Sequence, residues 1–238
     1  MTTPTSSSGF GPAATQFFED LEDQNTREFW LAHKDVFERE VREPMAALLD
    51  SLPEEYQPFK VFRMNRDIRF SPDKSPYKTM HGAAHGMPGA VHYLHLDASG
   101  LMVACGSYMM PPDELERYRQ AVAADSSGQE LAEILDELGR HRSVQLSRGG
   151  AEPLKTAPRG YPRDHPRADL LRQKGLIATR TRTGSDLQNG PRLRFFVIET
   201  FAMCADLTDW LKRYVSPPAL SSWPSHRRYP TLRGMFTL

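Results

Sequence analysis

Residues 91–108 read V-H-Y-L-H-L-D-A-S-G-L-M-V-A-C-G-S-Y, and the fold class follows from them. Two strand-like runs flank the turn at residues 97–100, where Gly100 can adopt the backbone angles that a tight turn requires. Alternate residues of a strand point to opposite faces, so His92 and Leu94 share one face while Tyr93 and His95 share the other. This segment predicts an antiparallel hairpin in the middle of the chain.

Amphipathic helical patterns lie on both sides of the hairpin. Apolar residues recur at three- and four-residue steps in residues 12–23 and 25–52, and Pro44 predicts a kink or a break in the second pattern. Residues 112–138 predict two further helices, and residues 191–214 predict one long final helix. We therefore expect an α+β single domain, with a central, mainly antiparallel sheet packed by amphipathic helices from both ends of the chain.

Length and composition fit one globular domain with short extensions. The chain has 238 residues, of which 39% are hydrophobic and 25% are charged, and this is enough to bury a sizeable core. We expect a disordered leader at residues 1–11, the α+β domain at residues 12–216 and a C-terminal tail at residues 217–238. No apolar run approaches the roughly 20 residues that span a bilayer, and no secretory pattern is visible, so we expect a cytoplasmic protein without a membrane partner.

Residues 60–81, K-V-F-R-M-N-R-D-I-R-F-S-P-D-K-S-P-Y-K-T-M-H, hold six Lys or Arg against two Asp. Guanidinium, ammonium and hydroxyl groups at this density suit the binding of a phosphate or a carboxylate. The alternative is a solvated strand face whose bases pair with Asp67 and Asp73. The predicted ligand contacts here are Arg63, Arg66, Arg69, Asp73, Lys74, Ser75, Tyr77, Lys78 and Thr79, and the candidate catalytic residues are Asp67 and Tyr77.

A second basic segment, residues 154–166, reads L-K-T-A-P-R-G-Y-P-R-D-H-P. We expect Lys155, Arg159 and His165 to join the first segment around an anion, and Tyr108 to stack on the ligand or to donate its hydroxyl. The alternative is a connection stiffened by prolines that packs through its apolar residues.

Familiar catalytic and metal-binding patterns are absent from the sequence. It contains no phosphate-binding Walker loop, no H-E-x-x-H, no G-x-S-x-G and no dinucleotide-binding glycine pattern. His81, His85, His92 and His95 are close in sequence, but His92 and His95 fall on opposite faces of a strand, so we predict no metal site. Cys105 and Cys204 lie in apolar contexts and are expected to be buried thiols, with a disulfide or redox site as the alternative. No reaction and no cofactor is assigned from the sequence.

Four segments resemble one known family in order and spacing. They are N-T-R-E-F-W-L-A-H-K-D-V-F-E, R-M-N-R-D-I-R-F-S-P-D-K-S-P-Y-K-T, G-S-Y-M-M-P-P-D-E-L and L-K-T-A-P-R-G-Y-P-R-D-H-P-R-A-D-L-L-R-Q-K-G-L. The chain resembles, over about residues 13–215, the bacterial and fungal family called domain of unknown function two-four-six-one. The resemblance implies a single α+β domain, found mostly in cytosolic proteins, with no established activity.

The leading hypothesis is a pocket that binds a phosphate- or carboxylate-bearing small molecule, and the sequence leaves open whether the site is enzymatic. One alternative is a nucleic-acid-binding module in which the same bases contact phosphates, but the net charge of zero favours the pocket. Another alternative is a structural or partner-binding domain whose basic surface meets acidic helices. The sequence does not define an oligomeric state.

Overall fold

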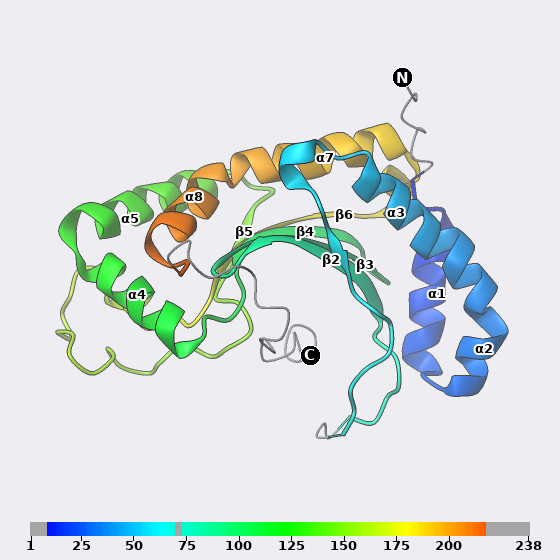
Figure 1. The fold of residues 1–238 in the computed structure, drawn as a ribbon, viewed down its shortest axis with the longest axis horizontal. Helices are drawn as coiled ribbons and strands as arrows, with labels where there is room; N and C mark the ends of the chain where they lie inside the picture. Colours follow the sequence, from blue (N-terminus) through cyan, green and yellow to red (C-terminus); the bar gives the residue numbers. More distant parts are fainter. Residues whose placement is uncertain (1–8, 70–72, 218–238) are drawn as a thin grey trace. The chain divides into compact units, whose positions relative to one another are not determined.

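The computed structural model describes residues 9–69 and 73–217 and has the α+β fold that the sequence predicts (Figure 1). Within these residues, six strands form one antiparallel sheet in the order β1-β2-β3-β4-β6-β5. The predicted hairpin is confirmed as β3 and β4, which are joined by residues 98 and 99. The strands are β1 (Lys60–Val61), β2 (Met80–Met87), β3 (Ala90–Asp97), β4 (Gly100–Ser107), β5 (Gln145–Ser147) and β6 (Leu176–Arg182).

Strand β2 does not follow from the sequence pattern, because M-H-G-A-A-H-G-M lacks the alternation of apolar and polar residues that marks a half-buried strand. Close packing against β3 explains the glycine at position 82. A Cβ atom on Gly82 would lie 2.8 Å from the hydroxyl of Tyr93 and 3.0 Å from the carbonyl oxygen of Leu94. Strand β1, in contrast, covers only the first two residues of the basic segment at residues 60–81, and its Lys60 pairs with Ala84 of β2.

The described chain forms two compact units, and each is built from three segments. The first unit comprises the chain up to His85 together with residues 93–103 and 181–200. The second unit comprises residues 86–92 and 104–180 together with the chain from Phe201 onward. The two units are described separately below. In neither unit is a described helix both long and apolar enough to cross a membrane.

The N-terminal helices of the first unit are α1 and a continuous helical stretch from Arg27 to Asp50 (Figure 1). Thr26 caps this stretch, and its hydroxyl accepts a hydrogen bond of 3.1 Å from the backbone N–H of Phe29. Pro44 does not break the stretch, because the preceding residues widen into a π-helix in which Glu43 N–H bonds to Glu38. The elements are α1 (Pro12–Asp23), α2 (Arg27–Val36), η1 (Phe37–Arg42), α3 (Glu43–Asp50), η2 (Glu54–Tyr56) and η3 (Gly184–Gln188).

Part of the segment expected to be a disordered leader is packed in the first unit. Phe10 is 1% exposed, and its backbone N–H donates a hydrogen bond of 2.7 Å to the carbonyl of Leu187. Burial of an aromatic ring repays the ordering of the backbone around it. Residues 1–8 of that leader, and the predicted tail from residue 218, lie outside the described residues.

The helices of the second unit differ from the prediction at one place. The single helix expected over residues 191–214 is two helices, because Cys204 has the non-helical angles φ −92° and ψ 7° and caps the second of them. Helix α7 begins in the first unit and ends in the second, at the residue before this cap. The elements are α4 (Pro112–Ala123), α5 (Asp125–Arg140), α6 (Ala168–Leu171), α7 (Gly190–Met203) and α8 (Ala205–Tyr214).

The junction between α4 and α5 is held by one arginine and one tryptophan. The guanidinium of Arg167 donates hydrogen bonds to the carbonyls of Val122 (2.7 Å) and Ala123 (3.2 Å), the last two residues of α4. It also donates at 3.2 Å to the carbonyl of Ala124, which accepts from the backbone N–H of Gly128 as well. A Cβ atom at position 128 would overlap the Arg167 guanidinium, so glycine there permits its close approach. The fully buried Trp210 donates from Nε1 to the carbonyl of Ser127 at 2.9 Å.

Candidate functional site

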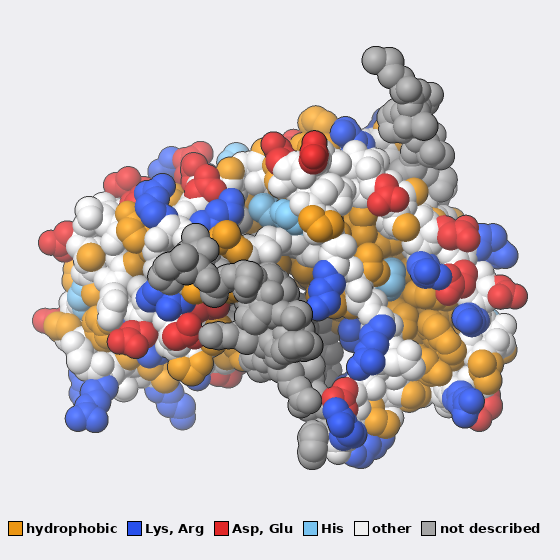
Figure 2. Space-filling view, viewed as in Figure 1, with side chains coloured by type: hydrophobic (Ala, Val, Ile, Leu, Met, Phe, Trp, Pro, Cys, Tyr) orange, Lys and Arg blue, Asp and Glu red, His pale blue; other side chains and the backbone are white. Residues whose placement is uncertain are grey.

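The predicted binding segment forms a two-stranded arm, which we define as residues 62–79, extending from β1 and β2 (Figure 1). Two backbone hydrogen bonds join its sides, from Lys78 N–H to Met64 (2.9 Å) and from Arg66 N–H to Pro76 (2.8 Å), and a third joins Phe62 N–H to Gly82 of β2 (2.9 Å). Figure 2 shows Lys and Arg side chains gathered along this arm. The basic segment singled out in the sequence thus forms this arm, and residues 70–72 lie outside the described residues. Its role in binding an anion stays a prediction.

Asn25 and Trp30 attach the arm to the N-terminal helices. The Asn25 side chain donates to the backbone carbonyl of Tyr77 and accepts from its backbone N–H, both at 3.0 Å. The Tyr77 ring stacks on Trp30 with centroids 4.6 Å apart and is only 6% exposed. These contacts are those of a core aromatic residue, so we leave Tyr77 out of the ligand contacts proposed below.

Replacement of Asn25 by alanine should lower the free energy of unfolding by about 2 kcal/mol, because it leaves both backbone polar groups of Tyr77 without their partner. Urea unfolding followed by circular dichroism would measure this change. The matched control is Gln24→Ala at the exposed neighbouring position, which should stay within about 0.5 kcal/mol of wild type. Equal stability of the two variants would show that Asn25 does not hold the arm.

The outer part of the arm neutralises much of its own charge. Arg66 forms an ion pair with Asp73, and Asp73 also accepts hydrogen bonds from the Ser75 hydroxyl (2.7 Å) and backbone N–H (2.8 Å). The hydrogen bonds from Ser75, followed by the one from Arg66, hold the pKa of Asp73 well below its ordinary value. At Asp73 the contacts are those of the alternative interpretation, in which basic side chains of the segment pair with its two aspartates.

Two more of the predicted residues at the outer part are engaged within the arm. Arg69 forms a two-pronged ion pair with Asp67, with both N–O distances at 2.9 Å. Lys74 donates to the carbonyl of Ile68 at 3.1 Å. Asp67, proposed from the sequence as a base, therefore serves as the partner of an arginine in this structure.

The base of the arm has a different electrostatic character. Lys78 is half-buried with its ammonium 5.3 Å from the centroid of the Phe62 ring. Burial lowers the pKa of Lys78, and the nearby charges of Arg63 and Arg66 lower it further. Neither Arg63 nor Lys78 forms an ion pair with an acidic side chain in the described part of the chain. Positive charge is thus concentrated here without full compensation.

His81, at the start of β2, lies next to this base. Its ring is 3% exposed and meets the edge of Phe37 in η1 at a centroid distance of 5.2 Å. Within residues 9–69 and 73–217, neither ring nitrogen has a hydrogen-bond partner, which is rare for a buried polar group. Burial, assisted by the charges of Arg42 and Lys78 and opposed by Glu38, lowers the pKa of His81 to about 4.

The remaining predicted contacts belong to the second unit. Lys155 and Arg159 are exposed, whereas His165 is half-buried and accepts a hydrogen bond of 3.0 Å at Nδ1 from the backbone N–H of Arg167. Tyr108 is half-buried, its carbonyl accepts from Gly150 N–H at 2.9 Å, and burial raises the pKa of its phenol. The joint site that we expected from the two basic segments stays a prediction.

The histidines and cysteines were weighed in the sequence as metal ligands and as buried thiols. Among the described residues, no group of three or more His, Cys, Asp or Glu side chains is arranged to hold a metal ion. Cys105 and Cys204 are buried free thiols, in agreement with the preferred expectation. A hydrogen bond between the two side chains lowers the pKa of Cys204, and burial raises that of Cys105.

The fold and these contacts define a class of α+β proteins with a basic arm anchored on N-terminal helices. A family model described as "Conserved hypothetical protein (DUF2461)" matches residues 13–210. The chain belongs to this family, as its resemblance to that family implied. A search of curated proteins found no match.

Proposed function

We propose that the protein binds a small molecule bearing a phosphate or a carboxylate at the base of the arm. The observation that carries this proposal is the half-buried ammonium of Lys78, which lies 5.3 Å from the centroid of the Phe62 ring and has no acidic partner among the described residues. Burial and the charges of two neighbouring arginines lower its pKa. Holding like charges together in a partly buried place costs free energy, and a bound anion would recover it. The contacts we assign are Arg63, Lys78 and Thr79.

His81 and Phe37 are the uncharged side chains that we place along one side of the proposed site. A buried neutral imidazole has one N–H donor and one acceptor, and both would find partners on a hydrated anion. The aromatic edge of Phe37 keeps bulk water away, and this strengthens ionic contacts. We assign no reaction to the site, and a cytoplasmic location stays a prediction from the sequence.

Nucleic-acid binding is the second candidate, because Figure 2 shows basic side chains along the exposed arm. We favour the small anion, because Asp67 and Asp73 already pair with arginines of the outer arm and reduce the charge offered to a polyanion. The two candidates differ in the effect of salt and of ligand length.

The test is a thermal-shift titration of the full chain with inorganic phosphate, a mononucleotide and single-stranded oligonucleotides. Phosphate or the mononucleotide should raise the melting temperature at millimolar concentration, because a ligand that binds only the folded state stabilises it. Arg63→Gln combined with Lys78→Met should abolish the shift. Lys60→Met, at an exposed position of β1, is the matched control and should retain it.

An equal shift in the double variant would refute the proposed location. Oligonucleotide binding with a steep salt dependence, and with no shift from small anions, would replace the proposal by the nucleic-acid candidate.

A further inference from the structure

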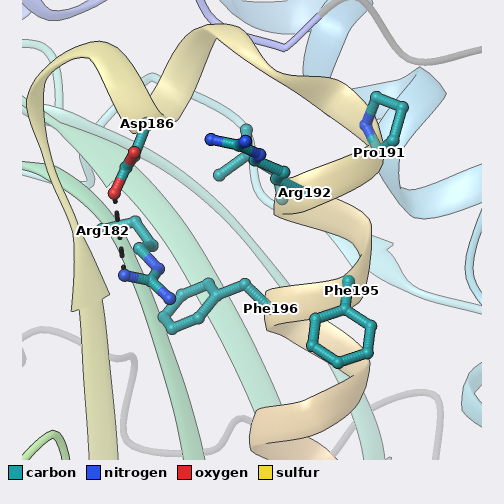
Figure 3. A pocket seen from close by; sticks show the side chains of 7 residues that line it. Arg182, Asp186, Pro191, Arg192, Phe195 and Phe196 are labelled. Atoms are coloured by element: carbon teal, nitrogen blue, oxygen red, sulfur yellow. Dashed lines mark ion pairs between the residues drawn. The ribbon is translucent and has the colours of Figure 1, made fainter.

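A pocket of about 390 Å³ lies in the first unit beside the first two turns of α7, and none of the site residues predicted from the sequence lines it (Figure 3). Its size falls at the lower end of the range for small-molecule sites. The lining comes from β6, η3 and α7 and consists of Arg182, Asp186, Pro191, Arg192, Leu193, Phe195 and Phe196.

Two arginines give the pocket a positive character. The guanidinium of Arg182 lies 4.7 Å from the centroid of the Phe196 ring and 3.7 Å from Asp186, which is too long for a hydrogen bond. The side chain of Arg192 has no ion-pair or hydrogen-bond partner in the described ranges. Two guanidinium groups against one carboxylate leave the pocket with a net positive charge, and their N–H groups are available to an acceptor.

The N–H groups that face the pocket belong to arginine side chains and not to the N-terminus of α7. Asn189 already accepts a hydrogen bond of 3.0 Å from the backbone N–H of Arg192, so the first turn of α7 is capped. The charge of the pocket therefore comes from Arg182 and Arg192.

An aromatic wall adjoins the two arginines. In Figure 3, the Phe196 side chain reaches from α7 toward Arg182. The Phe195 ring lies on the side of Phe196 that faces away from Arg182. Phe195 is 66% exposed, which is unusual for so large an apolar side chain, whereas Phe196 is buried. The stacking of Arg182 on Phe196 holds the guanidinium flat and orders its donors before any ligand arrives.

We infer that this pocket binds a small anion attached to a planar apolar group, such as an aromatic phosphate or carboxylate. The anionic group contacts Arg182 and Arg192, and the planar group covers Phe195. This site is independent of the one proposed at the arm.

The experiment is an NMR titration of the ¹⁵N-labelled full chain with phenyl phosphate, inorganic phosphate and phenol. Phenyl phosphate should shift the amide signals of residues 182–196, and Arg192→Gln should weaken its binding about tenfold, because a charge-assisted contact is lost. Phe195→Ala should weaken phenyl phosphate about threefold and leave the affinity for inorganic phosphate unchanged. Both altered side chains are exposed, so the variants should fold normally.

Two substitutions on exposed positions of α2 serve as matched controls, Arg27→Gln for charge and Leu31→Ala for apolar area. Both should bind phenyl phosphate as wild type does. Shifts confined to residues 62–79 would mean that phenyl phosphate binds only the arm, and this would overturn the inference. An unchanged affinity in Arg192→Gln would overturn it as well.

Discussion

Lowering the pH from 7 to 4 should reduce the free energy of unfolding by about 3 kcal/mol through His81 alone. The ring has an ordinary pKa of 6.5 when the chain is unfolded and a pKa of about 4 in the fold. Between these values the unfolded chain binds a proton that the folded chain does not, so stability falls as the pH falls. The loss begins near pH 6.5 and is complete below about pH 4.

The physical reason is the surroundings of the ring. Phe37 offers no acceptor to an imidazolium, and the charges of Arg42 from η1 and Lys78 from the arm repel it. Glu38, the acidic group that acts on the ring, already forms an ion pair with Arg42. Protonation would therefore create a poorly compensated buried charge.

The measurement is a series of urea unfolding curves from pH 7 to 4 for wild type and His81→Leu. The variant should lose about 3 kcal/mol less than wild type over this range, and His141→Gln, at an exposed position, should lose as much as wild type because it retains His81. NMR of the His81 ring should show a neutral imidazole down to about pH 4. Parallel curves for wild type and His81→Leu would disprove the assignment.

Replacement of Arg167 by alanine should destabilise the protein by about 3 kcal/mol. The guanidinium bonds to three carbonyls at the end of α4, and its side chain is only 11% exposed. Loss of the charge-assisted hydrogen bonds leaves the carbonyls of Val122 and Ala123 without the Arg167 donor, and the positive charge at that helix terminus also disappears. The stability of Arg167→Lys should lie between that of wild type and that of Arg167→Ala, since an ammonium group cannot reach all three acceptors.

The matched control is Arg163→Ala, an exposed arginine of the same loop, which should stay within about 0.5 kcal/mol of wild type. Urea unfolding curves would measure the free energy of unfolding of both variants, and the slope of that free energy against urea concentration should equal that of wild type. Equal effects at the two positions would show that the loop arginines share a role, whereas the expected difference assigns Arg167 to the fold.

The sequence predicted those parts of the fold in which local pattern and tertiary environment agree. The hairpin of β3 and β4 has turn chemistry and strand propensity, and α1 has an apolar stripe with a proline at its start. Strand β2 could not be predicted, because the close approach of Tyr93 and Leu94, and not strand propensity, explains the glycine at position 82. The break at Cys204 likewise interrupts a pattern that stays helical in sequence.

The sequence indicates where basic residues gather, and it does not give the contacts that they make. Charge density indicated the arm, but only the fold shows that Asp67 pairs with Arg69 and Asp73 with Arg66, while Lys78 has no acidic partner in the described part of the chain. Burial of His81 against Phe37 depends on residues more than forty positions apart, so no local signal marks it. The pocket at Arg182 and Arg192 is likewise assembled from three elements with no shared motif.

The interleaving of the two units has a consequence for how the chain folds. The first unit includes residues 181–200 and the second includes the chain from Phe201 onward, so neither is complete until most of the polypeptide has left the ribosome. Contacts between distant segments slow folding, because a long loop must close before they form. Refolding of this protein should therefore be slower than that of a helical bundle of equal length, and no contiguous fragment contains all the segments of either unit without residues of the other.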